Sequence, residues 1–366
     1  MRRLGILHRE ELLGHSFGPW HPFKGRERYE AFMRHLKESG LLERPNVRVV
    51  VTDRVATEED VLAVHDRELV SAVKFLSARG GWLDGDTPVP PGTYELALIQ
   101  AGALMQGCEM IMRGELEVAV QCAMFGGHHA TRRHVGKSFG FCYFNQEAVA
   151  VRSLQRSGLA SRVFILDLDA HHGNGIHEIF YDDPTVFYMS LHQDPRTLYP
   201  GTGRVEEVGE GEGRGFTANV PLPPGTSDDD YLYALRELFP PLAEAFRPDL
   251  LLVLLGADTY YNDPLTSMSL TMRAYLEASR LVARVADEVC GGRVALELAG
   301  GYDVEATGRA FYIATSVMAG VEDVDASDRE PFRDPWVSRR VREVVERVRG
   351  ALSPYWPGLW GPGQQG

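Results

Sequence analysis

Short runs of apolar and β-branched residues alternate along this chain with longer stretches in which apolar residues recur at helical spacing. Several of the short runs are apolar at every position, which is typical of strands that are covered on both faces. The pattern predicts strands at 47–51, 117–121, 163–168, 186–191, 216–220, 250–255 and 294–298.

The longer stretches between these runs predict helices. Helical spacing of apolar residues indicates helices at 28–38, 93–113 and 271–289. Capping-box sequences at Thr57 and Ser227 indicate two further helix starts, and Gly291 is expected to end the third long helix. Alternating strands and helices favour an α/β fold, with a mostly parallel sheet and helices on both faces.

Composition narrows the class of protein. No linker divides the 366 residues, so we expect one domain over 1–366, with a surface tail after about residue 353. There is no run of 18 apolar residues and no signal-peptide pattern, and the net charge is −13, so neither a membrane nor a nucleic acid is expected as partner. The four cysteines form no C-x-x-C pair, which favours reduced thiols and a cytoplasmic location.

Acidic and histidine side chains follow two of the predicted strands. Asp167, Asp169 and His171 lie at alternate positions after the third strand, so they can share one face of an extended chain. Carboxylates and imidazoles that converge suit a divalent metal such as zinc. Asp258, after the sixth strand, is a candidate third ligand and would leave a position open for water. The alternative is that these residues cap a helix or a loop.

Two further strand ends carry groups that suit acid–base chemistry. His128 and His129 follow paired glycines after the second predicted strand, and histidine can act as general base and general acid near neutral pH. Ligation of a second metal is the alternative for this pair. Tyr302 follows the last predicted strand, where its phenol could stabilise a developing oxyanion, the alternative being a core tyrosine.

Taken in order, these segments resemble the arginase–deacetylase superfamily, specifically the zinc-dependent histone deacetylases, acetylpolyamine amidohydrolases and acetoin-utilisation proteins. The resemblance spans about residues 15–320 and rests on the segments 21–24, 127–130, 140–145, 167–175, 190–203, 256–265 and 300–302. It implies the arginase/deacetylase fold, one deacetylase-like catalytic domain and one catalytic zinc ion per chain. The implied reaction is hydrolysis of an N-acetyl amide in a small-molecule or peptide substrate, such as acetyl-lysine or an acetylpolyamine.

The resemblance also assigns roles to single positions. Zinc would be held by Asp169, His171 and Asp258. The paired histidines and Tyr302 would be catalytic, with Asp167 as partner of His128 and Asn174 as partner of His129. Many relatives have an aspartate at position 174. Because an amide cannot hold a histidine cationic as a carboxylate does, the pKa of His129 should be less raised. The sequence does not decide which histidine is the base.

Further positions match an ion site and a substrate tunnel. A structural potassium ion would be bound by Asp167, the Ser190 hydroxyl and the backbone carbonyls of Asp169, His171 and Leu191. Matches around the substrate are the aromatic walls Phe141 and Tyr199, Leu265 at the tunnel mouth, Gly127, and the rim aspartate Asp86. Relatives usually have an arginine a few residues after the His-Pro pair. The spacing differs in this chain, so Arg26 and Arg28 are both candidates for that arginine.

Other functional classes remain to be weighed. Residues 14–18 match the G-x-S-x-G nucleophile elbow of serine hydrolases, but the prolines that follow Ser16 oppose the helix which that motif requires. A deacetylase-fold binding or regulatory protein is a second alternative, and a hydrolase of another small acetylated metabolite a third. An arginase-type enzyme is excluded, because histidines stand where its second metal would need carboxylates. The oligomeric state stays open, a homo-oligomer included.

Overall fold

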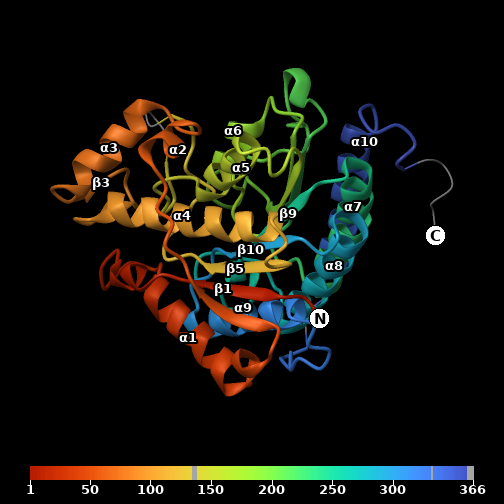
Figure 1. Cartoon of the computed structure of the whole chain (residues 1–366). Helices are drawn as coiled ribbons and strands as arrows, with labels where there is room; N and C mark the ends of the chain where they lie inside the picture. The colour runs from red at the N-terminus through yellow and green to blue at the C-terminus, as the bar shows by residue number, and fades with distance from the viewer. Residues whose placement is uncertain (134–137, 331–332, 361–366) are drawn as a thin grey trace.

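The computed structural model describes residues 1–133, 138–330 and 333–360, and its centre is an eight-stranded parallel sheet (Figure 1). The order of strands across the sheet is β2-β1-β5-β10-β9-β6-β7-β8. Their bounds are β1 Leu4–His8, β2 Val47–Val51, β5 Val118–Cys122, β6 Val163–Asp167, β7 Val186–Gln193, β8 Thr217–Leu222, β9 Leu250–Leu255 and β10 Val294–Leu298. A separate antiparallel pair is formed by β3 (Gly81–Trp82) and β4 (Pro88–Val89).

Helices connect the strands, as parallel pairing requires. Their bounds are α1 Gly25–Glu38, α2 Glu58–Leu62, α3 Arg67–Ser77, α4 Thr93–Met112, α5 Gln146–Arg156, α6 Asn174–Phe180, α7 Asp228–Phe246, α8 Met272–Cys290, α9 Val304–Met318 and α10 Pro335–Leu352. Short 3-10 helices lie at Glu10–Gly14, Leu41–Glu43, Gly211–Gly213 and Ala257–Thr259. No helix in the described ranges is both long and apolar enough to cross a membrane.

Each face of the sheet has its own buried core, since successive side chains of a strand point to opposite faces. Val163 and Ile165 of β6 pack with residues of α4 and α5, whereas Phe164 and Leu166 pack with residues of α1, α7, α8 and α9. In Figure 1, α4 and α5 lie above the sheet and α1 and α9 below it. The predicted α/β class, a parallel sheet with helices on both faces, is confirmed.

The apolar runs locate the strands to within two residues, with two differences. The run at Leu4–His8 was not predicted, although β1 pairs with both β2 and β5 inside the sheet. The strand β2 is an edge strand, and Val49 and Val51 are 41% and 73% exposed. An apolar run therefore indicates a strand here, but it does not show that both faces of the strand are covered.

The two predicted capping boxes have different outcomes. At Thr57 both hydrogen bonds of the box with Asp60 are present, so this prediction is confirmed. At Ser227 the helix start is confirmed, since α7 begins at Asp228, but the box does not form, because the Ser227 side chain makes no capping hydrogen bond. The carboxylate of Asp230, which would complete that box, instead accepts a hydrogen bond from Ser338 in α10. Tertiary contacts thus replace a local cap at the start of α7.

The predicted end of the third long helix and the predicted C-terminal tail are also described by the structure. Gly291 ends α8 with φ of +64°, a left-handed conformation that favours glycine, as predicted. The tail after residue 353 packs on the surface through Trp356, whose indole N–H donates to the carbonyl of Gly215 at 2.8 Å. The last six residues of the predicted tail, 361–366, lie outside the described residues.

Candidate active site

The predicted chemical groups come together because they follow neighbouring strands. The strands β5, β10, β9 and β6 are adjacent in the sheet, and parallel strands end at the same edge. The histidine pair follows β5, Tyr302 follows β10, Asp258 follows β9, and the Asp167–His171 segment follows β6. Residues up to 174 positions apart in the sequence therefore surround one point.

The three predicted zinc ligands form a buried triad. One potential ligand atom from each of Asp169, His171 and Asp258 lies within 4.8 Å of the others. Nδ1 of His171 is 2.8 Å from Oδ2 of Asp258 and 3.2 Å from Oδ1 of Asp169. The remaining carboxylate oxygens accept backbone hydrogen bonds, from Gly300 to Asp169 and from Ala170 to Asp258, both at 2.9 Å. Backbone donors thus fix the direction in which each carboxylate points.

The electrostatics of the triad favour a cation. Burial, followed by the negative charge of Asp169, raises the pKa of Asp258 to about 8. Burial opposes a charge on His171 as well, but its contacts with the two carboxylates raise its pKa to about 10. Two buried carboxylates side by side need a positive partner, either a proton or a metal ion. Two carboxylates and one imidazole are a donor set that fits zinc.

Two glycines make room for this triad. A Cβ atom on Gly256 would lie 2.6 Å from Oδ1 of Asp258, and a Cβ atom on Gly300 would clash with Oδ2 of Asp169. The strand ends can therefore approach the carboxylates only because neither residue has a side chain.

The first histidine of the pair is bonded to a carboxylate. The Nδ1–H of His128 donates to Oδ2 of Asp167 at 3.1 Å, and the hydroxyl of Tyr188 donates to the same oxygen at 2.9 Å. Burial alone would lower the pKa of His128, but the negative charges of Asp167 and Asp169 and the hydrogen bond to Asp167 together raise this pKa to about 9. His128 is therefore cationic at neutral pH.

The second histidine has an amide as its partner. The Nδ1–H of His129 donates to Oδ1 of Asn174, the first residue of α6, at 2.7 Å. Burial and the nearby positive charges of His128 and His171 lower the pKa of His129 well below its ordinary value. We expected the pKa of His129 to be less raised than it would be beside a carboxylate. The pKa is in fact lowered. His129 is neutral near pH 7, and its Nε2 can accept a proton.

Tyr302 stands beside the triad. Its ring centroid is 6.2 Å from that of His171 and 6.0 Å from that of Phe141. Its backbone N–H donates to Oδ2 of Asp263 at 2.9 Å, which fixes the segment after β10. Burial and the charges of Asp258 and Asp169 raise the pKa of the phenol well above its ordinary value, so the hydroxyl keeps its proton and can donate it in a hydrogen bond.

The two predicted tunnel walls lie on the approach to these groups. The ring of Tyr199 is 4.9 Å from that of His129, centroid to centroid, and packs against Gly140. Phe141 has φ of +68°, an unusual conformation for a residue other than glycine, and its backbone N–H donates to the Thr87 hydroxyl at 3.0 Å. An anchored, strained backbone at this point holds the Phe141 ring in a defined position.

The predicted rim residues are at the surface. Leu265 is 38% exposed and its N–H donates to Asp263 at 2.9 Å, next to the anchor of Tyr302. Asp86 is exposed, and its backbone carbonyl lies 3.1 Å from Nε2 of His21, whose ring contacts Phe141. Burial of its carboxyl, then a hydrogen bond with Asp84, raises the pKa of Asp86 to about 6.

The remaining predictions concern an ion site and an arginine. Ser190 is the register partner of Asp167 on the adjacent strand β7, and the next residue is Leu191, so three predicted potassium ligands are neighbours. Of the two candidate arginines, Arg26 is exposed and pairs with Glu30. Arg28 is fully buried and donates to the carbonyl oxygens of Ala123, Ala299 and Gly301. Arg28 is therefore the one that braces the site.

Residues 14–18, which match the sequence motif of a serine nucleophile, do not have the structure of a nucleophile elbow. Ser16 is exposed in a loop that follows a 3-10 helix, and its hydroxyl accepts a hydrogen bond from the backbone of Gly18 at 3.1 Å. A nucleophile elbow needs a strand before the serine and a helix after it. Residues 14–18 have neither.

Sequence reasoning missed two buried acids next to the site. Glu147 in the first turn of α5 and Glu297 in β10 are 1% and 0% exposed, and both line a cavity that His128, His129 and Tyr302 also line. Glu297 gave a signal that could have been used, since an acid inside an apolar strand that is covered on both faces is costly. Glu147 gave no such signal, because an acid in the first turn of a helix is common.

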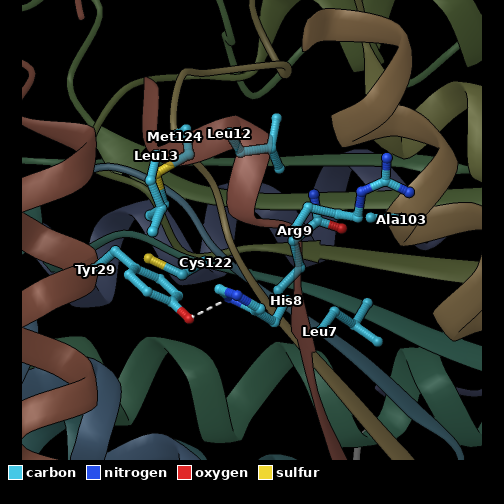
Figure 2. Close-up of a pocket in the computed structure, with 10 residues that line it drawn as sticks. Leu7, His8, Arg9, Leu12, Leu13, Tyr29, Ala103, Cys122 and Met124 are labelled. Atoms are coloured by element: carbon cyan, nitrogen blue, oxygen red, sulfur yellow. Dashed lines mark hydrogen bonds between the residues drawn. The ribbon is translucent and has the colours of Figure 1, made fainter. Parts of the chain in front are cut away.

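Another small cavity lies away from these groups (Figure 2). Its volume is about 10 Å³, and apolar side chains such as Leu12 and Met124 form much of its wall. His8 and Tyr29 meet across it through a hydrogen bond of 2.7 Å. None of the predicted site residues lines this cavity, so it is not the candidate active site.

Comparisons with known proteins agree with this geometry. Residues 21–318 match the model of the histone deacetylase domain family. The chain is 38% identical to a probable deacetylase of Archaeoglobus fulgidus over 365 residues, covering 96% of this chain and 98% of the relative. It is 36% identical to a histone deacetylase-like amidohydrolase of Pseudomonas aeruginosa, covering 76% and 72%. A crystal structure of the HDA15 HD domain matches with a TM-score of 0.83 and 28% identity, covering 97% of each chain.

The chain belongs to the histone deacetylase family, and it is a hydrolase of the deacetylase and amidohydrolase class. The resemblance found in the sequence is thereby confirmed, while the role of each site residue is the subject of the proposal that follows.

Proposed function

We propose that this enzyme removes the acetyl group from the amide of a linear primary amine, either acetyl-lysine in a peptide or an acetylpolyamine. The observation that carries the proposal is the buried triad of Asp169, His171 and Asp258 beside the histidine pair and Tyr302. A small acetylated metabolite of another kind is the alternative substrate. Membership of the family supports deacetylase chemistry, whereas the identity of the substrate is our proposal.

The cofactors in this proposal are zinc and potassium. Zinc would be held by the triad, and when bound it polarises the acyl carbonyl and lowers the pKa of water. Potassium would be held by Asp167, the hydroxyl of Ser190 and the carbonyl groups of Asp169, His171 and Leu191, at the paired ends of β6 and β7. Its role would be structural, since it would join two strand ends that carry site residues.

His129 is proposed as the group that moves protons. Its Nδ1–H is bonded to Asn174 and its imidazole is neutral, so Nε2 can take a proton from the attacking water. As the C–N bond breaks, the same nitrogen can give that proton to the leaving amine. His128, held cationic by Asp167, would stabilise negative charge without itself exchanging protons.

Tyr302 would donate its phenolic hydrogen to the carbonyl oxygen as negative charge develops there. The phenol keeps its proton at neutral pH, and its backbone is anchored to Asp263. In comparable sites, one donor to such an oxyanion contributes about 3–4 kcal/mol to transition-state stabilisation. This contribution appears in kcat rather than in substrate binding.

Substrate selection would depend on the tunnel and its rim. The rings of Phe141 and Tyr199 would pack on both sides of an unbranched alkyl chain, a surface that favours a lysine or polyamine chain over a branched amide. Gly127 would leave space beside the acyl group, and Leu265 and Asp86 would contact the part of the substrate outside the tunnel. The free cysteines of the chain support a cytoplasmic location.

A comparison of substrates tests the proposal. Steady-state kinetics with an acetyl-lysine peptide, acetylputrescine and acetylspermidine should show release of acetate from at least one of them, and a chelator should abolish it. Absence of acetate release from all three, in protein that binds zinc, would favour the binding or regulatory alternative. Inhibition by a serine-directed reagent instead of a chelator would contradict the proposed chemistry.

A further inference from the structure

Behind the histidine pair lies a small cavity with an acidic floor. Its volume is about 20 Å³. Its catalytic wall is formed by His128, His129, Asp169 and Tyr302, and its far wall by Gln146, Glu147 and Glu297. A cavity of this volume accommodates one group of about the size of a water molecule. The cavity is therefore large enough for one additional non-hydrogen atom beside the reacting acyl group.

The acids on the far wall have oxygen atoms without protein partners. Oε2 of Glu147 and Oε2 of Glu297 are both buried and make no hydrogen bond within the protein. The other oxygen of Glu297 accepts from the amide of Gln146 at 2.6 Å. Leaving a buried carboxyl oxygen without a hydrogen bond costs about 1–3 kcal/mol or more. Two such oxygen atoms in one cavity favour the binding of a group there that donates a hydrogen bond.

Glycines keep this cavity open toward the reacting groups. A Cβ atom on Gly127 would clash with the carboxyl of Glu147 and the side chain of Gln146, and a Cβ atom on Gly126 would lie 2.5 Å from Sγ of Cys142. Both glycines and the residues that such a Cβ atom would meet line the cavity, so a side chain at either glycine would reduce its volume. In the proposed binding mode the alkyl amine would lie between Phe141 and Tyr199, so the acyl group would be the part that faces the cavity.

We infer that this enzyme accepts, and prefers, a 2-hydroxyacyl amide, in which the hydroxyl group of the acyl chain donates a hydrogen bond to the unpartnered Oε2 atom of Glu147. The simplest case is the glycolyl group, an acetyl group that carries one hydroxyl. The inference rests on the proposed deacylase function. The reaction is the same hydrolysis: water adds its oxygen to the acyl carbon, the C–N bond breaks, and glycolate and the free amine are released.

A hydroxyl fits this cavity better than the alternatives of the same size. A methyl group at the same place, as in a propionyl amide, would leave both acceptors without a donor. An ammonium group at the same place would lie beside the side chain of His128, which lines the same cavity and is held cationic by Asp167. A carboxyl accepts a hydrogen bond whether or not it is ionised, so the preference does not depend on the charge of the pair.

Four acyl groups on one lysine peptide test the inference: acetyl, glycolyl, propionyl and glycyl. We expect kcat/KM for the glycolyl peptide to exceed that for the isosteric propionyl peptide at least tenfold, about the effect of one hydrogen bond to a buried carboxyl. The glycyl peptide, with an ammonium group, should be a poorer substrate than the glycolyl peptide. Propionyl or glycyl turnover equal to or above that of glycolyl would overturn the inference.

Variants of Glu147 give the matched comparison, since its Oε2 atom makes no hydrogen bond that the substitution would break. Glu147→Met removes the acceptor at similar volume, so the glycolyl-to-propionyl ratio should fall to about one. Glu147→Gln keeps an acceptor oxygen and should retain most of the ratio. Glu115→Gln is the control, because Glu115 is exposed and lies before the start of β5, and this variant should leave the ratio unchanged.

These experiments distinguish a failure of the glycolyl preference from a failure of the proposed deacylase function. If the acetyl peptide is hydrolysed and the glycolyl preference is absent, only the inference is overturned. If none of the four peptides is hydrolysed by zinc-loaded protein, the proposed deacylase function falls, and the inference with it. An unchanged ratio in Glu147→Met that folds normally would also overturn it, because the acceptor would then have no part in the preference.

Discussion

Tyr302 is held by its backbone and its ring, which leaves the hydroxyl free for substrate. The backbone N–H is bonded to Asp263, and the ring packs near Phe23 and Phe141. Tyr302→Phe should therefore leave the fold and zinc content unchanged but lower kcat about 10²–10³-fold, with little change in KM. Stopped assays of acetate release will measure this. A variant with near-normal kcat would remove Tyr302 from the catalytic groups.

The partners of the two histidines differ by one atom, and this difference predicts a pH profile. Asn174→Asp would place a carboxylate beside His129 and favour its protonated form, so the pKa of His129 should rise by about 1 unit or more. The acidic limb of the kcat/KM profile should move to higher pH by the same amount. The basic limb should stay near pH 9, where His128 loses its proton. An acidic limb that does not move would exclude His129 as the proton acceptor.

Among the secondary-structure elements, the ends of β9 and β10 place backbone directly against the triad. Gly300→Ala would push a methyl group into Asp169, so we expect this variant to lose most of its zinc and its activity while the sheet stays folded. Elemental analysis and circular dichroism will test this. Gly14→Ala is the control, because a Cβ atom there meets no other atom within 4 Å. Equal zinc content in the two variants would contradict the packing argument.

The elements also explain what the sequence could predict. Asp169, His171 and Asp258 were predictable because each follows an apolar strand and parallel strands end at one edge of the sheet. The strand β1 was missed because Gly5 and His8 interrupt its apolar run, so that only Ile6 and Leu7 are adjacent apolar residues. The start of α7 was predictable, but the box at Ser227 does not form, because a partner 108 residues from Asp230 takes its carboxylate, and a local motif cannot report this.

The acid pair shows a second limit of prediction, because its two members come from different layers of the molecule. Glu147 belongs to a helix and Glu297 to a strand 150 residues later, and only the packing of α5 on the sheet joins them at one cavity. The sequence could have indicated that Glu297 is unusual. It could not have indicated which residue shares its cavity.

For the molecule as a whole, this pair predicts how stability depends on pH. Burial raises the pKa of Glu297 to about 7, so the folded state holds a proton that the unfolded chain releases above its ordinary value of 4.5. The associated stability is present below about pH 4.5 and is lost as the pH rises through about 7. Glu297→Gln has no proton to lose. Relative to the wild type, its free energy of unfolding should rise by up to about 3 kcal/mol between pH 4.5 and pH 8.

Denaturant unfolding of zinc-loaded protein at several pH values will measure this difference. Comparison of the variant with the wild type at each pH cancels the titration of the other groups. A difference that stays constant across the range would show that Glu297 has an ordinary pKa in the folded protein, and the account of the acidic cavity would need revision.

The proposed function requires one metal ion held by Asp169, His171 and Asp258. The most direct measurement is acetate release from an acetyl-lysine peptide while chelator-stripped protein is titrated with zinc. Activity should rise in proportion to added zinc and reach a plateau at one zinc ion per chain, and Asp258→Ala should show no such recovery. Full activity in the stripped protein, or an equal plateau in Asp258→Ala, would contradict the claim.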